Sequence, residues 1–185
     1  MNQRISLAII YGSARQDCYC DTIIEWIASA AARYSHFDLQ LIDPLESSRA
    51  RGPSSPGLPL KQLEHQLGQA DAFIVITPGY HYGHVAPLNG LIDTAREHWQ
   101  AKPVGFISYG GLSGDLRATE QLRLMFAKLH AITLSESVNF ASPGQDPCAA
   151  GPSAEPAAGL DAMKSLLANL GRWATALRAA RYAMT

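Results

Sequence analysis

The feature that most constrains the fold of this chain is a set of three continuous apolar runs of strand length, each ended by glycine or proline. The runs are residues 4–11, 71–77 and 103–109. Runs of this kind are typical of strands that are buried on both faces of a parallel sheet. They therefore indicate an α/β protein in which helices cover both faces of the sheet.

Segments with helical spacing of apolar residues alternate with these runs. Two shorter strands at residues 38–43 and 131–140 bring the predicted sheet to five strands. Helices are predicted over residues 22–34, 60–69, 87–99, 116–130 and 160–182. Thr22 with Glu25 predicts a capping box at the start of the first helix, and Pro87 suits the first position of the third.

The apolar stripes of three helices predict which side chains face the core. They are Ile23, Ile27, Ala30 or Ala31 and Tyr34 in the first helix, Leu122, Met125, Phe126 and Leu129 in the fourth, and Leu166, Leu170, Trp173 and Leu177 in the last. Residues 44–59 and 141–159 are rich in proline and glycine and are predicted to lack regular structure. No repeat or linker divides the chain, so we expect a single domain over residues 1–185.

Composition excludes several classes of function. The net charge is -1 and lysines and arginines do not cluster, so no surface for DNA or RNA is indicated. The apolar stretch at residues 5–10 is too short for a membrane span and lacks a convincing signal-peptide cleavage site, so we expect a cytoplasmic protein. Cys18, Cys20 and Cys148 are too few for a disulfide scaffold, and the first two alone do not make a zinc site.

In parallel sheets of this type, ligands bind beyond the carboxyl ends of the strands, where the strand order reverses. In the order 2-1-3-4-5, the loops after the three long apolar runs converge on one crevice. The site is therefore expected among residues 12–20, 78–84 and 110–114.

The first of these loops, Gly12-Ser13-Ala14-Arg15, has the residue types of a phosphate site. A helix N-terminus presents free N–H groups, Ser13 adds a hydroxyl and Arg15 adds a cation. The alternative is a plain turn with an exposed arginine. The loop matches neither the glycine fingerprint of dinucleotide sites nor that of nucleoside triphosphate sites.

The second loop, residues 78–84, combines two tyrosines with free backbone N–H groups at a strand end. A flat heteroaromatic ring needs a stacking surface and donors at its edge, and this loop offers both. Alternatively, the tyrosines pack against the next helix and His81 and His84 are exposed. No carboxylate or cysteine completes a coordination shell for the two histidines, so no metal site is predicted.

The third loop runs Ser108-Tyr109-Gly110-Gly111-Leu112-Ser113-Gly114. Its glycines let a ring or a phosphate approach the backbone closely, or they simply make a turn. The loop is not the nucleophile elbow Gly-x-Ser-x-Gly, so Ser108 is not predicted to be a hydrolytic nucleophile.

The order and spacing of these motifs resemble those of the NAD(P)H-dependent FMN reductase family, which includes azo-, chromate- and quinone-reducing flavoproteins. The resemblance covers about residues 5–140. Its most specific segments are Gly12-Ser13-x-Arg15, Thr77-Pro78-x-Tyr80, Ala86-Pro87-Leu88 with Ile92-Asp93, and Lys102-Pro103-Val104-Gly105 with Ser108-x-Gly110-Gly111. It implies a flavodoxin-like three-layer sandwich with a five-stranded parallel sheet in the order 2-1-3-4-5.

The resemblance also implies which residues hold FMN. Near the phosphate they are Ser13 and Arg15, with Cys20, Asp21 and Thr22 where the family has serine and asparagine. Against the isoalloxazine they are Pro78, Gly79, Tyr80 and His81. On the other side of the ring they are Ser108, Tyr109, Gly110 and Gly111. The family commonly reads Pro-Glu-Tyr-Asn where this chain reads Pro78-Gly79-Tyr80-His81. Imidazole titrates near neutrality, which makes His81 the candidate proton donor to the acceptor.

The implied reaction is a transfer of hydride from NADPH or NADH to FMN and then of electrons to a flavin, a quinone or another small organic acceptor. The resemblance further implies a homodimer or homotetramer, with the helix that begins at Pro87 near the interface. Two alternatives stay open. One is a specialised biosynthetic flavoenzyme of the same fold, and the other is a flavin-binding or flavin-lacking interaction protein without reductase turnover.

Overall fold

The computed structural model describes residues 4–11, 18–34, 36–45, 60–78, 86–110, 116–140 and 157–183. Five parallel strands form one sheet in the order β2-β1-β3-β4-β5, which confirms the predicted order. The strands are β1 (Ile5–Tyr11), β2 (Phe37–Ile42), β3 (Ala72–Pro78), β4 (Pro103–Tyr109) and β5 (Ile132–Phe140). The helices are α1 (Cys18–Ala31), α3 (Leu60–Gln69), α4 (Ala86–Thr94), α5 (Leu116–Lys128) and α6 (Ala157–Ala183), with a 3-10 turn η1 (Arg96–His98).

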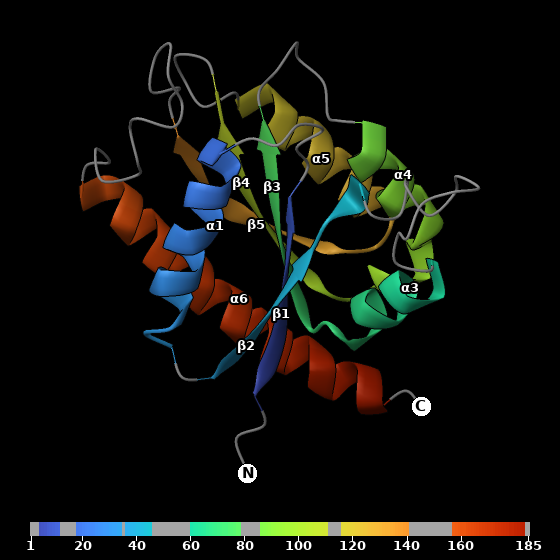
Figure 1. Cartoon of the computed structure of the whole chain (residues 1–185). Helices are drawn as coiled ribbons and strands as arrows, with labels where there is room; N and C mark the ends of the chain where they lie inside the picture. The colour runs from blue at the N-terminus through green and yellow to red at the C-terminus, as the bar shows by residue number, and fades with distance from the viewer. Residues whose placement is uncertain are drawn as a thin grey trace.

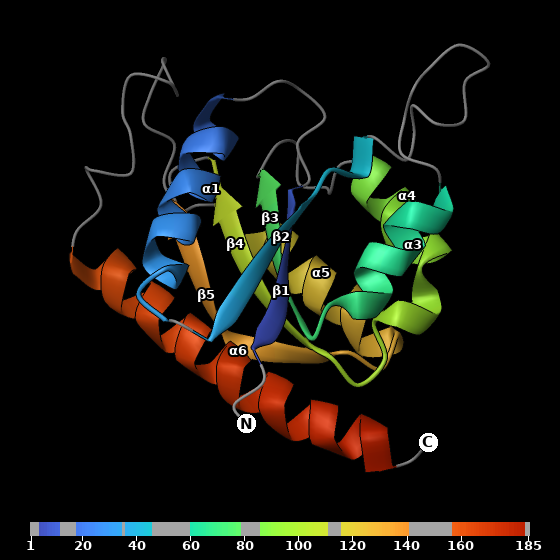
Figure 2. The same cartoon turned by 60° about the horizontal axis from the view of Figure 1, so that its bottom comes forward.

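The helices form two layers around the sheet (Figures 1 and 2). On one face, Ile23 and Ile27 of α1 and Leu166 and Leu170 of α6 pack against the sheet in one core cluster. On the other face, α3, α4 and α5 contribute a second cluster that contains Leu63, Leu88 and Leu122. All seven residues of β3 and of β4 are buried, as strands covered on both faces should be.

The close packing of α6 on β4 depends on Gly105. A Cβ atom added at this position would come within 2.8 Å of Leu166 Cδ1. Glycine therefore lets the long helix lie directly on the strand, and a larger residue would push Leu166 away from the sheet.

Several predicted helix boundaries are wrong. Helix α1 begins at Cys18, four residues before Thr22, so Thr22 lies within the helix and the predicted capping box does not exist. Helix α6 begins at residue 157 rather than 160, and α5 ends at Lys128 rather than 130. Pro44 and Leu45 are helical, although residues 44–59 were expected to lack regular structure. Asp43 explains this start, because its Oδ1 atom accepts a hydrogen bond from the Leu45 N–H at 2.7 Å.

The predicted helix over residues 87–99 is in fact α4 followed by η1. The indole N–H of Trp99 donates to the Ile92 carbonyl at 3.1 Å, and Trp99 is fully buried. A continuing α-helix would pair the same carbonyl with the N–H four residues later. The buried tryptophan thus supports the tighter turn at residues 96–98.

The predicted core face of α6 is wrong at Trp173, and Leu177 is only half-buried and lies outside the core cluster. Trp173 is 46% exposed, whereas Met163, Leu166, Leu167, Leu170 and Ala174 are buried. Those five residues form the stripe that meets the sheet, and Trp173 lies at its edge.

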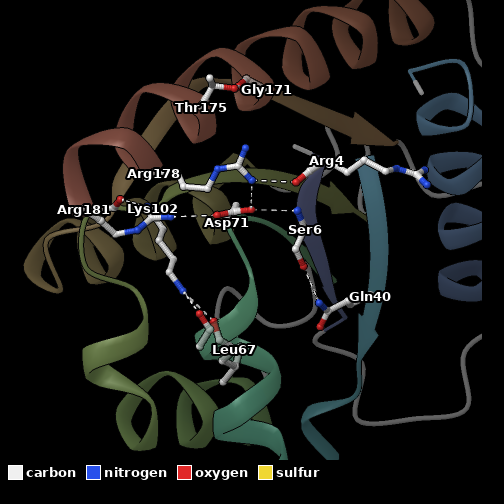
Figure 3. Close-up of polar contacts among 12 residues, drawn as sticks. Arg4, Ser6, Gln40, Leu67, Asp71, Lys102, Gly171, Thr175, Arg178 and Arg181 are labelled. Atoms are coloured by element: carbon white, nitrogen blue, oxygen red, sulfur yellow. Dashed lines mark hydrogen bonds and ion pairs between the residues drawn. The ribbon is translucent and has the colours of Figure 1, made fainter. Parts of the chain in front are cut away.

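A cluster of charged side chains lies at the amino ends of the strands, which we call the amino edge of the sheet (Figure 3). The carboxylate of Asp71 accepts hydrogen bonds from Arg178 Nη1 at 3.0 Å, from Arg181 Nη2 at 3.1 Å and from the N–H of Ser6 at 3.2 Å. The two arginines also donate to the carbonyls of Arg4 and Ala101. These bonds attach the end of α6 to the first residues of β1 and to the turns before β3 and β4.

Lys102 lies beside this cluster and binds the end of α3. Its Nζ atom donates to the carbonyls of Leu67 at 2.9 Å and Gly68 at 3.0 Å, which lie in the last turn of that helix. A cation at this position compensates the helix dipole and the carbonyls that lack helical partners. Burial lowers the pKa of Lys102 to about 8, with a further lowering from Arg181 that Asp71 opposes.

We expect Asp71→Asn to lower the free energy of unfolding by about 2 kcal/mol, because it leaves two largely buried guanidinium groups without their carboxylate. The side chain of Asp71 is 12% exposed. Asp161→Asn is the matched control, since Asp161 pairs with Lys164 where both side chains are more than half exposed. Urea unfolding should show a loss below about 0.5 kcal/mol for the control. Equal losses in the two variants would show that the cluster does not secure α6.

The lowered pKa of Lys102 predicts a pH dependence of stability. Folding lowers this pKa from 10.5 to about 8, so between these values the unfolded chain binds more protons than the folded chain. The stability contributed by this group therefore rises with pH across that window, by at most about 1.4 kcal/mol per pH unit. The measurement is the difference in unfolding free energy between the wild type and Lys102→Met from pH 7.5 to 10. A flat difference would contradict the lowered pKa.

Candidate functional site

The carboxyl ends of β1, β3 and β4 lie next to one another at one edge of the sheet. Tyr11, the last residue of β1, pairs with Ile76 of β3, and Pro78, the last residue of β3, pairs with Tyr109 of β4. Helices α1, α4 and α5 begin at the same edge (Figure 1). The topology therefore brings the three predicted loops to one place, opposite the edge that Asp71 closes.

The loops themselves, at residues 12–17, 79–85 and 111–115, lie outside the described residues. Six of the predicted site residues fall there: Ser13, Arg15, Gly79, Tyr80, His81 and Gly111. Their assignment stays a prediction from the sequence.

The residues predicted near the FMN phosphate lie at the start of α1. Cys20 and Asp21 are in its first turn and Thr22 follows them. The side chain of Cys20 is outside the described residues. Asp21 is exposed, so its carboxylate is solvated, which reduces its repulsion of a phosphate at the helix start.

The residues predicted beside the flavin ring are buried at the ends of β3 and β4. Pro78 is the last residue of β3, and Ser108 and Tyr109 are 0% and 2% exposed. The side chain of Tyr109 belongs to the core cluster on the α1 and α6 face. The side chain of Tyr109 therefore fixes the end of β4 in the core, and its backbone continues to the carboxyl edge of the sheet.

Gly110 turns the chain out of β4. Its φ angle is 118°, a region in which residues with a side chain are strained, and its N–H donates to the Phe140 carbonyl at 3.1 Å. The turn therefore requires glycine here. Gly110 is buried, and without a side chain its backbone can be approached closely by a neighbouring group.

Asn139 of β5 is a residue of this region that the sequence prediction missed. The Ser108 hydroxyl donates to Asn139 Oδ1 at 2.7 Å, and Asn139 Nδ2 donates to Ser137 Oγ at 3.4 Å. The signal was present in the sequence, because Ser137 and Asn139 are polar residues that alternate with buried ones at the end of a strand.

The described residues contain neither a metal-binding cluster nor a membrane-spanning helix. Among the described residues, no group of three or more histidine, cysteine, aspartate or glutamate side chains is arranged to hold a metal ion. No described helix is long and apolar enough to span a membrane.

Comparison with known proteins decides the family. The sequence profile of the NADPH-dependent FMN reductases matches residues 5–145. The chain belongs to this family. The matched range contains all five strands and all three loops of the candidate site. It ends before α6, whose attachment to the amino edge is thus a feature of the structure outside the match.

Relatives and solved structures agree with the assignment. An NAD(P)H-dependent FMN reductase of Schizosaccharomyces pombe is 31% identical over 118 residues, which are 58% of this chain and 59% of that protein. The flavoenzyme NAD(P)H:(acceptor) oxidoreductase FerB of Paracoccus denitrificans superimposes with a TM-score of 0.66 at 18% identity, over 94% of this chain and 97% of that one. A flavodoxin of Pseudomonas aeruginosa gives 0.54 at 17% identity, over 94% and 99%. The fold is therefore flavodoxin-like.

We expect Gly110→Ala to destabilise the protein by about 1–2 kcal/mol, because alanine at φ 118° is strained. The variant should also bind FMN more weakly than the wild type. Gly90→Ala is the control: it lies within α4, and an added Cβ there meets no atom within 4 Å. The control should gain about 0.5–1 kcal/mol and keep its FMN affinity. Thermal unfolding and FMN titration of both variants check this, and an unchanged stability of Gly110→Ala would contradict the strained turn.

Proposed function

We propose that this protein is an FMN-dependent oxidoreductase that passes electrons from NADPH or NADH to a flavin, a quinone or another small organic acceptor. The observation that carries the proposal is the family match over residues 5–145 on a chain whose three matched loops leave one edge of the sheet. Ligands of open parallel sheets bind at this edge. We infer further that the protein works in the cytoplasm as a homodimer or homotetramer.

The proposed FMN site fits the described residues at that edge. Helix α1 begins beside the end of β1, so its free N–H groups can receive a phosphate together with Ser13 and Arg15. Gly110 places no side chain at the end of β4, where the ring would lie between residues 78–81 and residues 109–111. When bound, FMN supplies the centre that accepts hydride from the nicotinamide and returns electrons to the acceptor.

The chain's own task is to bind and orient the two rings. The cofactor performs the redox step, so no side chain has to act as nucleophile. His81 is the proposed proton donor to the acceptor, because an imidazole at the edge of the ring holds a transferable proton near neutral pH. Buried Pro78 and Tyr109 fix the strand ends from which both ring-facing segments leave.

The test is anaerobic reduction of the FMN-loaded protein by NADPH and by NADH in a stopped-flow instrument. We expect the flavin absorbance near 450 nm to bleach at a rate of about 1–100 per second, in the range of ordinary enzyme turnover, and to recover when a quinone is added. Bound flavin that does not bleach would favour a specialised flavoenzyme or an interaction protein. A failure to bind FMN would overturn the proposal.

A comparison of two flavins tests the phosphate site separately. Arg15→Ala should raise the Kd for FMN about tenfold, because it removes a cation from the phosphate, and should leave the Kd for riboflavin unchanged. Arg33→Ala is the control, since Arg33 follows the end of α1, far along the helix from its start. Equal weakening of both flavins by Arg15→Ala would place Arg15 away from the phosphate.

A further inference from the structure

We propose that Asn139 is a positioning residue of the flavin site, which acts through Ser108 to hold the backbone of Tyr109 and Gly110 in place. The inference rests on the proposed function, because it concerns the segment that would face the FMN ring. Asn139 itself lies at the end of β5, the edge strand of the sheet, and in none of the three loops.

The contact between the two side chains is short and joins residues directly opposite each other. Ser108 of β4 pairs with Asn139 of β5, and the Ser108 hydroxyl donates to Asn139 Oδ1 at 2.7 Å. Ser108 is fully buried and Asn139 is half-buried, so the bond is partly shielded from water. One position further on, Tyr109 pairs with Phe140, and the Gly110 N–H donates to the Phe140 carbonyl at 3.1 Å. At the end of β4, a side-chain hydrogen bond to β5 is thus followed by a backbone hydrogen bond to β5.

The pairing of these two strands is irregular, which makes the bond more important. Val104 pairs with Thr133, but Phe106 pairs with Ser137, so β5 contains extra residues between these two pairs. The register of the first half of β4 therefore does not determine the register of its second half. The pairs from Phe106 to Tyr109 have to set it, and Ser108 with Asn139 joins one of these pairs by a side-chain hydrogen bond across the strands.

The geometry also gives Ser108 a role. Ser108 is predicted to bind the cofactor, and its hydroxyl donates its proton to Asn139 Oδ1. Ser108 would then affect FMN binding by fixing the end of β4. There the side chain of Tyr109 lies in the core and Gly110 makes the turn at φ 118°. Asn139 suits this position because its amide both accepts from Ser108 and donates toward Ser137.

The experiment compares FMN affinity, measured by quenching of flavin fluorescence, with stability of the FMN-free protein in urea. Asn139→Leu keeps the size of the side chain and removes both hydrogen-bonding groups. Ser108→Ala removes the donor. We expect each variant to raise the Kd for FMN about tenfold, and the double variant to raise it no more than about twofold further, because both changes break the same bond.

Two more variants separate positioning from a general loss of stability. Asn139→Asp keeps an oxygen that accepts from Ser108, and we expect its Kd to return to within about threefold of the wild type. Asn169→Leu is the matched control, because Asn169 Nδ2 donates to Glu136 Oε1 at 2.6 Å and so ties α6 to β5 away from the carboxyl edge. It should lower stability to a similar extent and change the Kd less than about twofold.

Each contrary outcome has a distinct meaning. If Asn139→Leu and Asn169→Leu lose stability equally and both keep their FMN affinity, the bond is structural only and the inference is wrong. If the effects of Ser108→Ala and Asn139→Leu on the Kd add, Asn139 does not act through Ser108. If the wild type itself binds no FMN, the proposed function fails and the inference fails with it.

Discussion

Burial of β3 and β4 on both faces is the constraint on which the rest of the structure depends. Every residue of these two strands is inaccessible to water, and their backbone groups pair with the strands on either side. Such strands can carry polar chemistry only at their ends, because an unpaired polar group in the middle would cost free energy. Polar groups of these strands are therefore confined to the amino edge and the carboxyl edge of the sheet, and the two differ in their residues.

Charged side chains cover the amino edge, where the strands begin. Asp71 precedes β3 and Lys102 precedes β4, and both side chains bind groups from distant parts of the chain. Arg178 and Arg181 reach Asp71 from one helix, so that helix is fixed at its end as well as along its apolar stripe. The same helix packs on Gly105, whose lack of a side chain lets it lie close to β4. The polar groups at this edge are paired with one another and with backbone carbonyls.

The sequence was sufficient for the strands and their order and insufficient for the contacts between distant residues. Continuous apolar runs identified β1, β3 and β4, because burial on both faces removes polar residues from a strand. The end of α4 was misplaced because the apolar periodicity does not encode the change to the 3-10 turn η1, next to which the Trp99 indole binds the Ile92 carbonyl. Asp71 was read as the first residue of a strand, since its arginine partners lie more than 100 residues further along the chain. Of the candidate site, the sequence indicated the three loops, but Asn139 comes from a strand that lies outside them.

The placement of Asn139 shows why loop motifs alone do not define a site in this fold. A loop that faces a ligand begins where a strand ends, so the position of its first residue depends on the register of that strand. In β4 this register is interrupted between Val104 and Phe106, so the last pairs with β5 determine where Gly110 begins its turn. Gly110 in turn needs a backbone angle that only glycine adopts without strain, and it needs the Phe140 carbonyl as a partner. In the proposed site, β5 thus acts through its pairing with β4, which its polar end residues stabilise.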